Sequence, residues 1–170
     1  MTRYETLTLL TCASRVARAF YHRSRPATEL SEWLERNPLG FEWGPESERF
    51  RSTQLSRQDW SDLQAKLARE ITRQKQARPD AMARNCADLA RYLGLNRVET
   101  DIFLLSARAA QGGPLAALVD NLVDDARLPV DQAIACLAAH PATAIRKAMR
   151  PTGKLMSSGL ISREGGRHDN

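Results

Sequence analysis

Apolar residues recur every three or four positions through most of this chain, which is the spacing of one face of an α-helix. A helix is predicted over residues 57–78, where the apolar stripe consists of Trp60, Leu63, Leu67 and Ile71. A similar stripe predicts a first helix over about residues 5–22. The alternation of apolar and polar positions that marks a half-buried strand is rare, so the pattern favours an all-α fold.

The segment "RPATELSEWLERNP" predicts a second short helix. Thr28 is its expected N-cap, because a hydroxyl there can accept a hydrogen bond from a free N–H group of the first turn. Asn37 and Pro38 are expected to end the helix. The following "LGFEWGPESERFRST" is rich in glycine, proline and aromatic residues and has no clear period, so it predicts an ordered loop or an edge hairpin.

Helix-ending residues divide the second half of the chain into about five short helices. Gly94 follows "PDAMARNCADLARYL" and is expected just past the end of that helix. Asn96 and Glu99 have the spacing of a capping box, which predicts the start of the next helix. Later helix boundaries are expected at Pro114, Pro141 and Pro151.

These elements predict an all-α, multi-helix bundle. Most bulky aromatic residues lie before residue 61, which suggests two parts that pack differently. We therefore expect an N-terminal helical segment with an aromatic loop over residues 1–79 and a helical, winged-helix-like domain over residues 80–170. The expected core of the second part consists of Leu89, Leu93, Ile102, Leu105, Leu118 and Leu122.

Residues 89–109 have the helix, glycine turn and helix of a helix-turn-helix motif. A helix that reads DNA must present positive charge to the phosphates, whereas this one carries Glu99 and Asp101 in its first two turns. Carboxylates suit the positive end of the helix dipole better than they suit DNA. We interpret this stretch as a packing element at the centre of the core.

A second candidate for nucleic-acid recognition lies further along, in residues 129–163. Its ending "LMSSGLISR" resembles the passage from a winged-helix recognition helix into its first wing strand, with Ser162–Gly166 as that strand and its turn. The four cations of this element are the candidate phosphate contacts: Arg146, Lys147, Arg150 and Lys154. Pro151 and Gly153 are expected to break the reading helix. Because a wing needs a returning strand, the natural protein is expected to continue past residue 170.

Two segments resemble the helical region that precedes the ATPase module in a group of bacterial AAA-type ATPases. The first has the form LAxxLGLxxxExDI and the second the form LxPxGxLxxSGLI, within residues 84–162. The matching residues of the first are Leu89, Ala90, Leu93, Gly94, Leu95, Glu99, Asp101 and Ile102. Those of the second are Met149, Pro151, Gly153, Leu155, Ser158, Gly159, Leu160 and Ile161. The resemblance implies a non-catalytic N-terminal domain whose ATPase module lies downstream.

The leading functional hypothesis is therefore a recognition or regulatory domain that binds a protein partner, a substrate or the downstream ATPase module. Its expected protein contacts are the aromatic residues Trp33, Phe41 and Trp43, although these residues could instead form a small core packed on the helix over residues 57–78. The alternative is nucleic-acid binding through the basic element at residues 141–154. A net charge of +5 permits that alternative without requiring it.

No catalytic or cofactor chemistry is predicted from the motifs. A phosphate-binding loop needs a hydroxyl after its Gly-Lys pair, and Leu155 follows Gly153 and Lys154. Cys136 and His140 have the spacing to share a helix face, yet no second pair of metal ligands accompanies them. We expect no enzyme activity, cofactor or metal. The three cysteines in unpaired positions and the lack of a signal peptide favour a reducing, cytoplasmic setting away from membranes.

Overall fold

The computed structural model describes residues 1–37, 39 and 55–162. Within these residues every regular element is helical and there is no strand, so the expected all-α fold is confirmed. The elements are α1 (Arg3–Ala19), α2 (Arg25–Arg36), α4 (Arg57–Gln74), α5 (Ala81–Tyr92), α6 (Arg97–Ala109), α7 (Pro114–Asp120), the π-helical turn η1 (Asn121–Asp125), α8 (Val130–Ala138), α9 (Ala142–Ala148) and α10 (Lys154–Ser157).

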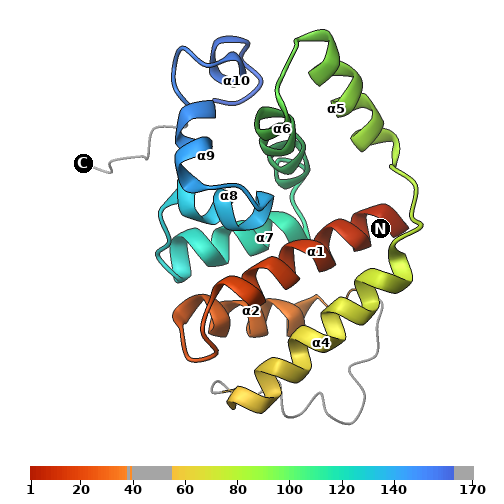
Figure 1. Ribbon diagram of the computed structural model, residues 1–170, viewed down its shortest axis with the longest axis vertical. Helices are drawn as coiled ribbons and strands as arrows, with labels where there is room; N and C mark the ends of the chain where they lie inside the picture. The colour runs from red at the N-terminus through yellow and green to blue at the C-terminus, as the bar shows by residue number, and fades with distance from the viewer. Residues whose placement is uncertain (38, 40–54, 163–170) are drawn as a thin grey trace.

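Helix α1 crosses the middle of the molecule (Figure 1). It packs against α2 and α4 on one side and against α8 on the other. Helix α6 lies between α5 and α9 and contacts both. The short helix α10 closes the far end of the structure beside α6. The two halves of the chain thus meet along α1.

The joint between α5 and α6 forms as predicted. Gly94 has a φ of +61°, and the Leu95 N–H donates to the Ala90 carbonyl at 2.8 Å, which is the pattern of a glycine-terminated helix. At the start of α6 the Glu99 N–H donates to Asn96 Oδ1 at 3.0 Å, and the Asn96 N–H donates to Glu99 Oε2 at 2.8 Å. These local bonds fix the direction in which α6 leaves the turn.

Other helix ends differ from the predictions. Helix α2 begins at Arg25 with Ser24 in the N-cap position, so the expected N-cap at Thr28 is wrong. Pro26 lies in the first turn of α2, where its fixed φ suits the helix and its missing N–H costs no hydrogen bond. Helix α4 ends at Gln74, four residues before the end predicted at residue 78.

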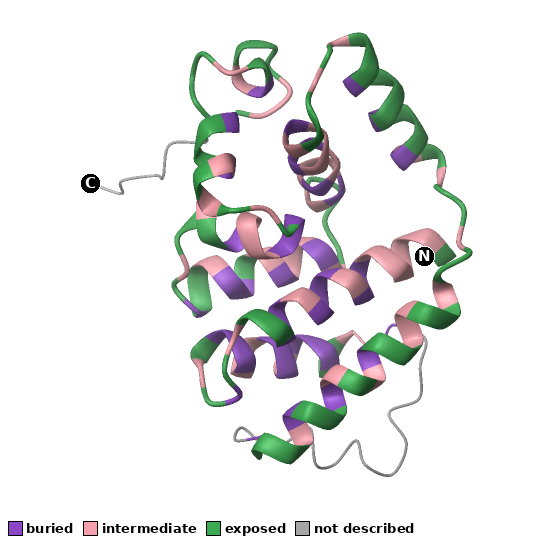
Figure 2. Cartoon of the chain, viewed as in Figure 1, coloured by how far each residue is buried: buried purple, intermediate pink, exposed green. Residues whose placement is uncertain are grey.

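The buried apolar residues form two clusters (Figure 2). The larger takes residues from α1, α2, α4, α6, α7, η1 and α8. The smaller takes residues from α5, α6, α8, α9 and α10. The larger cluster draws on both sides of the boundary expected at residue 79, and the division into two domains stays a prediction.

Four of the six predicted core residues are buried, and the exceptions are Leu89 on α5 and Leu93 just past its end, which is only partly buried. Ile102, Leu105, Leu118 and Leu122 are all buried, as expected. Leu89 is wrong as a core residue, because its side chain is 38% exposed. Helix α5 contacts α6 through the small residues Ala83, Cys86 and Ala90, which form a narrow face that leaves Leu89 at its edge.

The predicted reading helix and wing do not form in the described residues. Helix α9 ends at Ala148, and α10 is a separate helix of four residues. A Cβ atom at Gly153 would lie 2.8 Å from the Ala148 carbonyl oxygen, so the turn between the two helices requires glycine. Ser162 belongs to no strand, and residues 163–166 of the expected wing lie outside the described residues.

A buried ion pair joins the start of α5 to the end of α6. Arg108 Nη2 donates to both carboxylate oxygens of Asp80, at 2.7 and 2.8 Å. Thr2 donates a further hydrogen bond to Asp80, which also caps α5 by accepting from the Ala83 N–H. Burial alone would raise the pKa of the Asp80 carboxyl, but these hydrogen bonds and the Arg108 charge outweigh it and lower the pKa.

Leucine-to-alanine substitutions at one buried and one partly exposed position test which leucines belong to the core. Leu105→Ala should destabilise the protein by about 2–5 kcal/mol, because it leaves a cavity in the larger cluster. Leu89→Ala removes a half-exposed side chain and should cost only about 0.5 kcal/mol. Urea denaturation of both variants measures the difference, and equal losses would contradict the packing described for α5 and α6.

The Asp80–Arg108 pair should make stability depend on acid pH. Because the pKa of folded Asp80 lies below its ordinary 3.8, the pair stabilises the fold above that value and the contribution is lost as the pH falls through the folded pKa. Asp80→Asn should cost about 3–5 kcal/mol near neutral pH and show a smaller loss on acidification.

Urea midpoints from neutral pH down to values below 3.8 measure this dependence. Asp88→Asn is the matched control, because Asp88 pairs with Arg91 on the surface, where ion pairs contribute little. Identical pH profiles for Asp80→Asn and the wild-type protein would show that the buried pair does not carry the effect.

Candidate functional site: a basic groove beside helix α6

Of the three aromatic residues expected to contact a protein partner, only Trp33 belongs to the described residues. Trp33 is only 1% exposed, and its indole Nε1 donates to the Pro114 carbonyl at 2.6 Å. Trp33 is therefore not exposed to a partner. It packs in the larger cluster, and its helix contacts α1, α7 and η1, whereas the core alternative placed it in a small core on the helix over residues 57–78. Phe41 and Trp43 lie outside the described residues.

The basic residues predicted near the end of the chain line a groove between the start of α6 and the α9–α10 turn. This basic groove has a volume of about 630 Å³. Three of the four predicted cations line it, and Arg97 from the first turn of α6 joins them. The four are Arg97, Lys147, Arg150 and Lys154.

Buried apolar anchors hold these cations at the surface. Ile145 and Leu155 are fully buried in the smaller cluster and fix α9 and α10 against α6. Lys147 and Arg150 then project from the exposed side of the α9 end and of the turn. Lys154 Nζ donates to the Gly94 carbonyl, which ties α10 to the joint between α5 and α6.

Two features distinguish this groove from an ordinary solvated surface, namely its positive charge and the apolar residues of its floor. Its only carboxylate among the described lining residues belongs to Glu99, which is 7% exposed and engaged in the capping box of α6. The floor is apolar and consists of Val98, Ala144 and Ala148. The groove thus combines a basic rim with an apolar base.

Arg146 belongs to a different surface. Its guanidinium donates to the Asp131 carboxylate at 2.7 Å and does not line the groove. The sequence analysis groups Arg146 with the other three cations only because they are neighbours in the chain. Helix geometry separates it, since α9 turns Arg146 toward the start of α8.

Arg97 is the groove residue that the sequence reasoning missed as a site. It lies fifty positions before Lys147, and its neighbours in the chain indicate only a helix start. The packing of α9 on α6 brings it beside the later cations. Nothing in the local pattern around Arg97 signals that proximity.

The thiols of Cys12 and Cys136 are held in their neutral form by burial. Burial raises the pKa of the Cys12 thiol to about 12 and that of Cys136 to about 11, so both are protonated near neutral pH. His140 Nε2 lies 2.7 Å from Asp101 Oδ2 rather than beside a second metal-binding pair. Among the described residues no three side chains of histidine, cysteine, aspartate or glutamate are grouped to hold a metal ion.

No helix in the described ranges is by itself both long and apolar enough to cross a lipid bilayer. Helix α6 and the segment Pro114–Asp125 reach the required length and apolarity only together, and a bend of 106° separates them. Both contribute buried residues to the larger cluster.

The raised thiol pKa values predict slow alkylation. Cys12 and Cys136 should resist iodoacetamide near neutral pH in the folded protein, because the thiolate is the reactive form. Both should react fully in guanidinium chloride. Mass spectrometry of the labelled protein measures the extent, with Tyr92→Cys as a control that places a thiol at an exposed position. Native labelling as fast as that of the control would contradict the burial of these thiols.

Comparison with known proteins returned no match of any kind: no family model, no curated protein and no solved structure is similar to this chain. The resemblance to the helical region of AAA-type ATPases therefore stays a hypothesis based on the two short segments. The groove and the chemistry of its residues provide the evidence for a function.

Proposed function

We propose that this chain is a non-catalytic recognition module of a larger AAA-type ATPase, and that it binds an acidic segment of a protein partner in the basic groove. One observation carries this proposal: four cations, from α6, α9, the α9–α10 turn and α10, line the groove together with its apolar residues. Charge complementarity selects an acidic partner, and the floor provides contact for small apolar side chains between the acidic ones.

The packing of the two ATPase-like segments supports a framework role for them. Leu95 and Ile102 of the first segment share the smaller cluster with residues of the second, namely Met149, Leu155, Leu160 and Ile161. Gly153 makes the close backbone turn, and Gly94 accepts the bond from Lys154. The residues of the resemblance thus build the walls behind the groove, which fits a recognition domain better than a catalytic centre.

The groove favours a peptide over a nucleic acid. A phosphate backbone is bound by charge and gains little from an apolar floor such as Val98 and Ala148. Arg146 is already paired with Asp131, and α9, at seven residues, is too short to follow a DNA groove. With so few free contacts, nucleic acid is expected to bind only weakly and without sequence preference, at about 10⁻⁴–10⁻⁶ M.

A direct binding assay tests this proposal. A fluorescein-labelled peptide that alternates glutamate with leucine and alanine should bind, whereas the same peptide with glutamine for glutamate should not. Lys147→Gln combined with Arg150→Gln should weaken binding at least about tenfold, because it removes two rim charges. Arg69→Gln combined with Lys75→Gln makes the same charge change on exposed positions in α4 and just past its end, and should leave affinity unchanged.

Fluorescence anisotropy at several salt concentrations separates the outcomes. Equal loss in the groove and control variants would show that net charge alone attracts the peptide, which would overturn the assignment of the groove. A short random-sequence DNA duplex is the competing probe. Tighter binding of that duplex, lost in the groove variant only, would favour the nucleic-acid alternative instead.

A further inference from the structure

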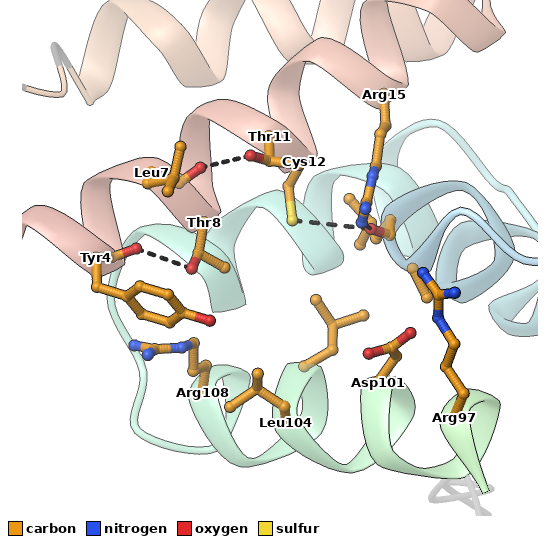
Figure 3. Close-up of a pocket in the computed structure, with 13 residues that line it drawn as sticks. Tyr4, Leu7, Thr8, Thr11, Cys12, Arg15, Arg97, Asp101, Leu104 and Arg108 are labelled. Carbon is orange, nitrogen blue, oxygen red and sulfur yellow. Dashed lines mark hydrogen bonds between the residues drawn. The ribbon is translucent and has the colours of Figure 1, made fainter. Parts of the chain in front are cut away.

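A second hollow lies between α6 and α1 (Figure 3). This α1–α6 pocket has a volume of about 290 Å³, close to the lower limit of small-molecule sites. Three arginines line it, namely Arg15, Arg97 and Arg108. Its apolar wall comes from Leu104, Leu105 and Leu137.

The positive charges lie at two separate ends of the pocket. Figure 3 shows Arg108 beside Tyr4 at one end and Arg15 with Arg97 at the other. The Arg108 guanidinium carbon lies 5.4 Å from the centre of the Tyr4 ring. Asp101 is the one described carboxylate in the lining, and its Oδ2 atom is engaged by His140. The pocket therefore has a cationic group at each end and leucines between them.

Arg108 carries a buried donor without an acceptor. Its side chain is 7% exposed, and Nη2 makes both hydrogen bonds to Asp80. Its Nε atom is buried and has no hydrogen-bond partner among the described residues. Because Nε is closed off from solvent, Arg108 would contact a ligand through Nη1, the guanidinium nitrogen that the pair with Asp80 leaves unused.

The remaining polar groups of the pocket are held in place. Arg15 Nη1 donates to the Leu137 carbonyl, which orients the arginine. The Thr8 and Thr11 hydroxyls donate to the Tyr4 and Leu7 carbonyls at 2.9 and 2.7 Å. Because these groups have partners already, the arginine N–H groups are the principal donors left for a ligand.

We propose that the α1–α6 pocket binds a small organic dianion with an oxyanion at each end and an apolar middle. One oxyanion, carboxylate or phosphate, pairs with Arg108, and the other pairs with Arg97 and Arg15. The leucine wall contacts the carbon chain between them. This site is separate from the basic groove and does not rest on the function proposed there, although Arg97 borders both.

Calorimetric titration at constant ionic strength tests the proposal with defined probes. Succinate, glutarate and adipate span a range of lengths, butyrate lacks the second carboxylate, and inorganic phosphate has no carbon chain. At least one dicarboxylate should bind about tenfold or more tightly than butyrate and phosphate, because only it engages both ends.

Three variants locate the binding. Arg97→Gln changes an exposed residue and should weaken the best dicarboxylate about tenfold, to the level of butyrate. Thr11→Met keeps every arginine and should abolish binding by filling the pocket. Lys147→Gln lies in the basic groove alone and should leave dicarboxylate affinity unchanged. Circular dichroism verifies that each variant is folded.

Several results would overturn the two-ended site. These are the absence of binding by every dicarboxylate, equal binding by butyrate or phosphate, and full affinity in folded Thr11→Met. A loss in Lys147→Gln as large as that in Arg97→Gln would place the anion in the basic groove. Failure of the peptide assay would leave these outcomes unaffected, since they are read from a different ligand.

Discussion

Helix α6 has to bury apolar side chains on two sides at once, and the rest of the structure depends on that constraint. Ile102 and Phe103 enter the smaller cluster, whereas Leu105 enters the larger one. The remaining helices divide around it accordingly. Both ends of α6 are fixed, one by the capping box at Asn96 and the other by the ion pair of Arg108. A helix held in this way gives Arg97 and Arg108 defined positions.

Local sequence patterns predict helix ends correctly where a residue type has a single favourable conformation or hydrogen-bonding arrangement. The capping box of Asn96 and Glu99 and the glycine end at Gly94 depend on backbone bonds within six residues, so they need no knowledge of the fold. The N-cap at Thr28 failed for a local reason too. The fixed φ of Pro26 already suits the first turn of α2, so the helix begins before Thr28.

Contacts between residues far apart in the chain could not be predicted from the sequence. The apolar stripe of α5 includes Leu89, yet only the partner helix decides how wide a face is covered, and α6 covers a narrow one. Trp33 stands beside an aromatic-rich segment in the chain, but its indole reaches a carbonyl at the start of α7. Three of the groove cations were found because they are neighbours in sequence, whereas Arg97 and the pocket residue Arg108 required the packing of distant helices.

The tight turn at Gly153 determines which residues near the groove can be substituted without changing the path of the backbone. A side chain at that position would collide with the backbone itself, so any descendant that keeps the path from α9 to α10 keeps glycine there. Lys147 and Arg150 are exposed, precede that glycine and can be exchanged without disturbing the path. Substitutions at these positions can therefore alter the charge of the groove while the backbone that presents it stays the same.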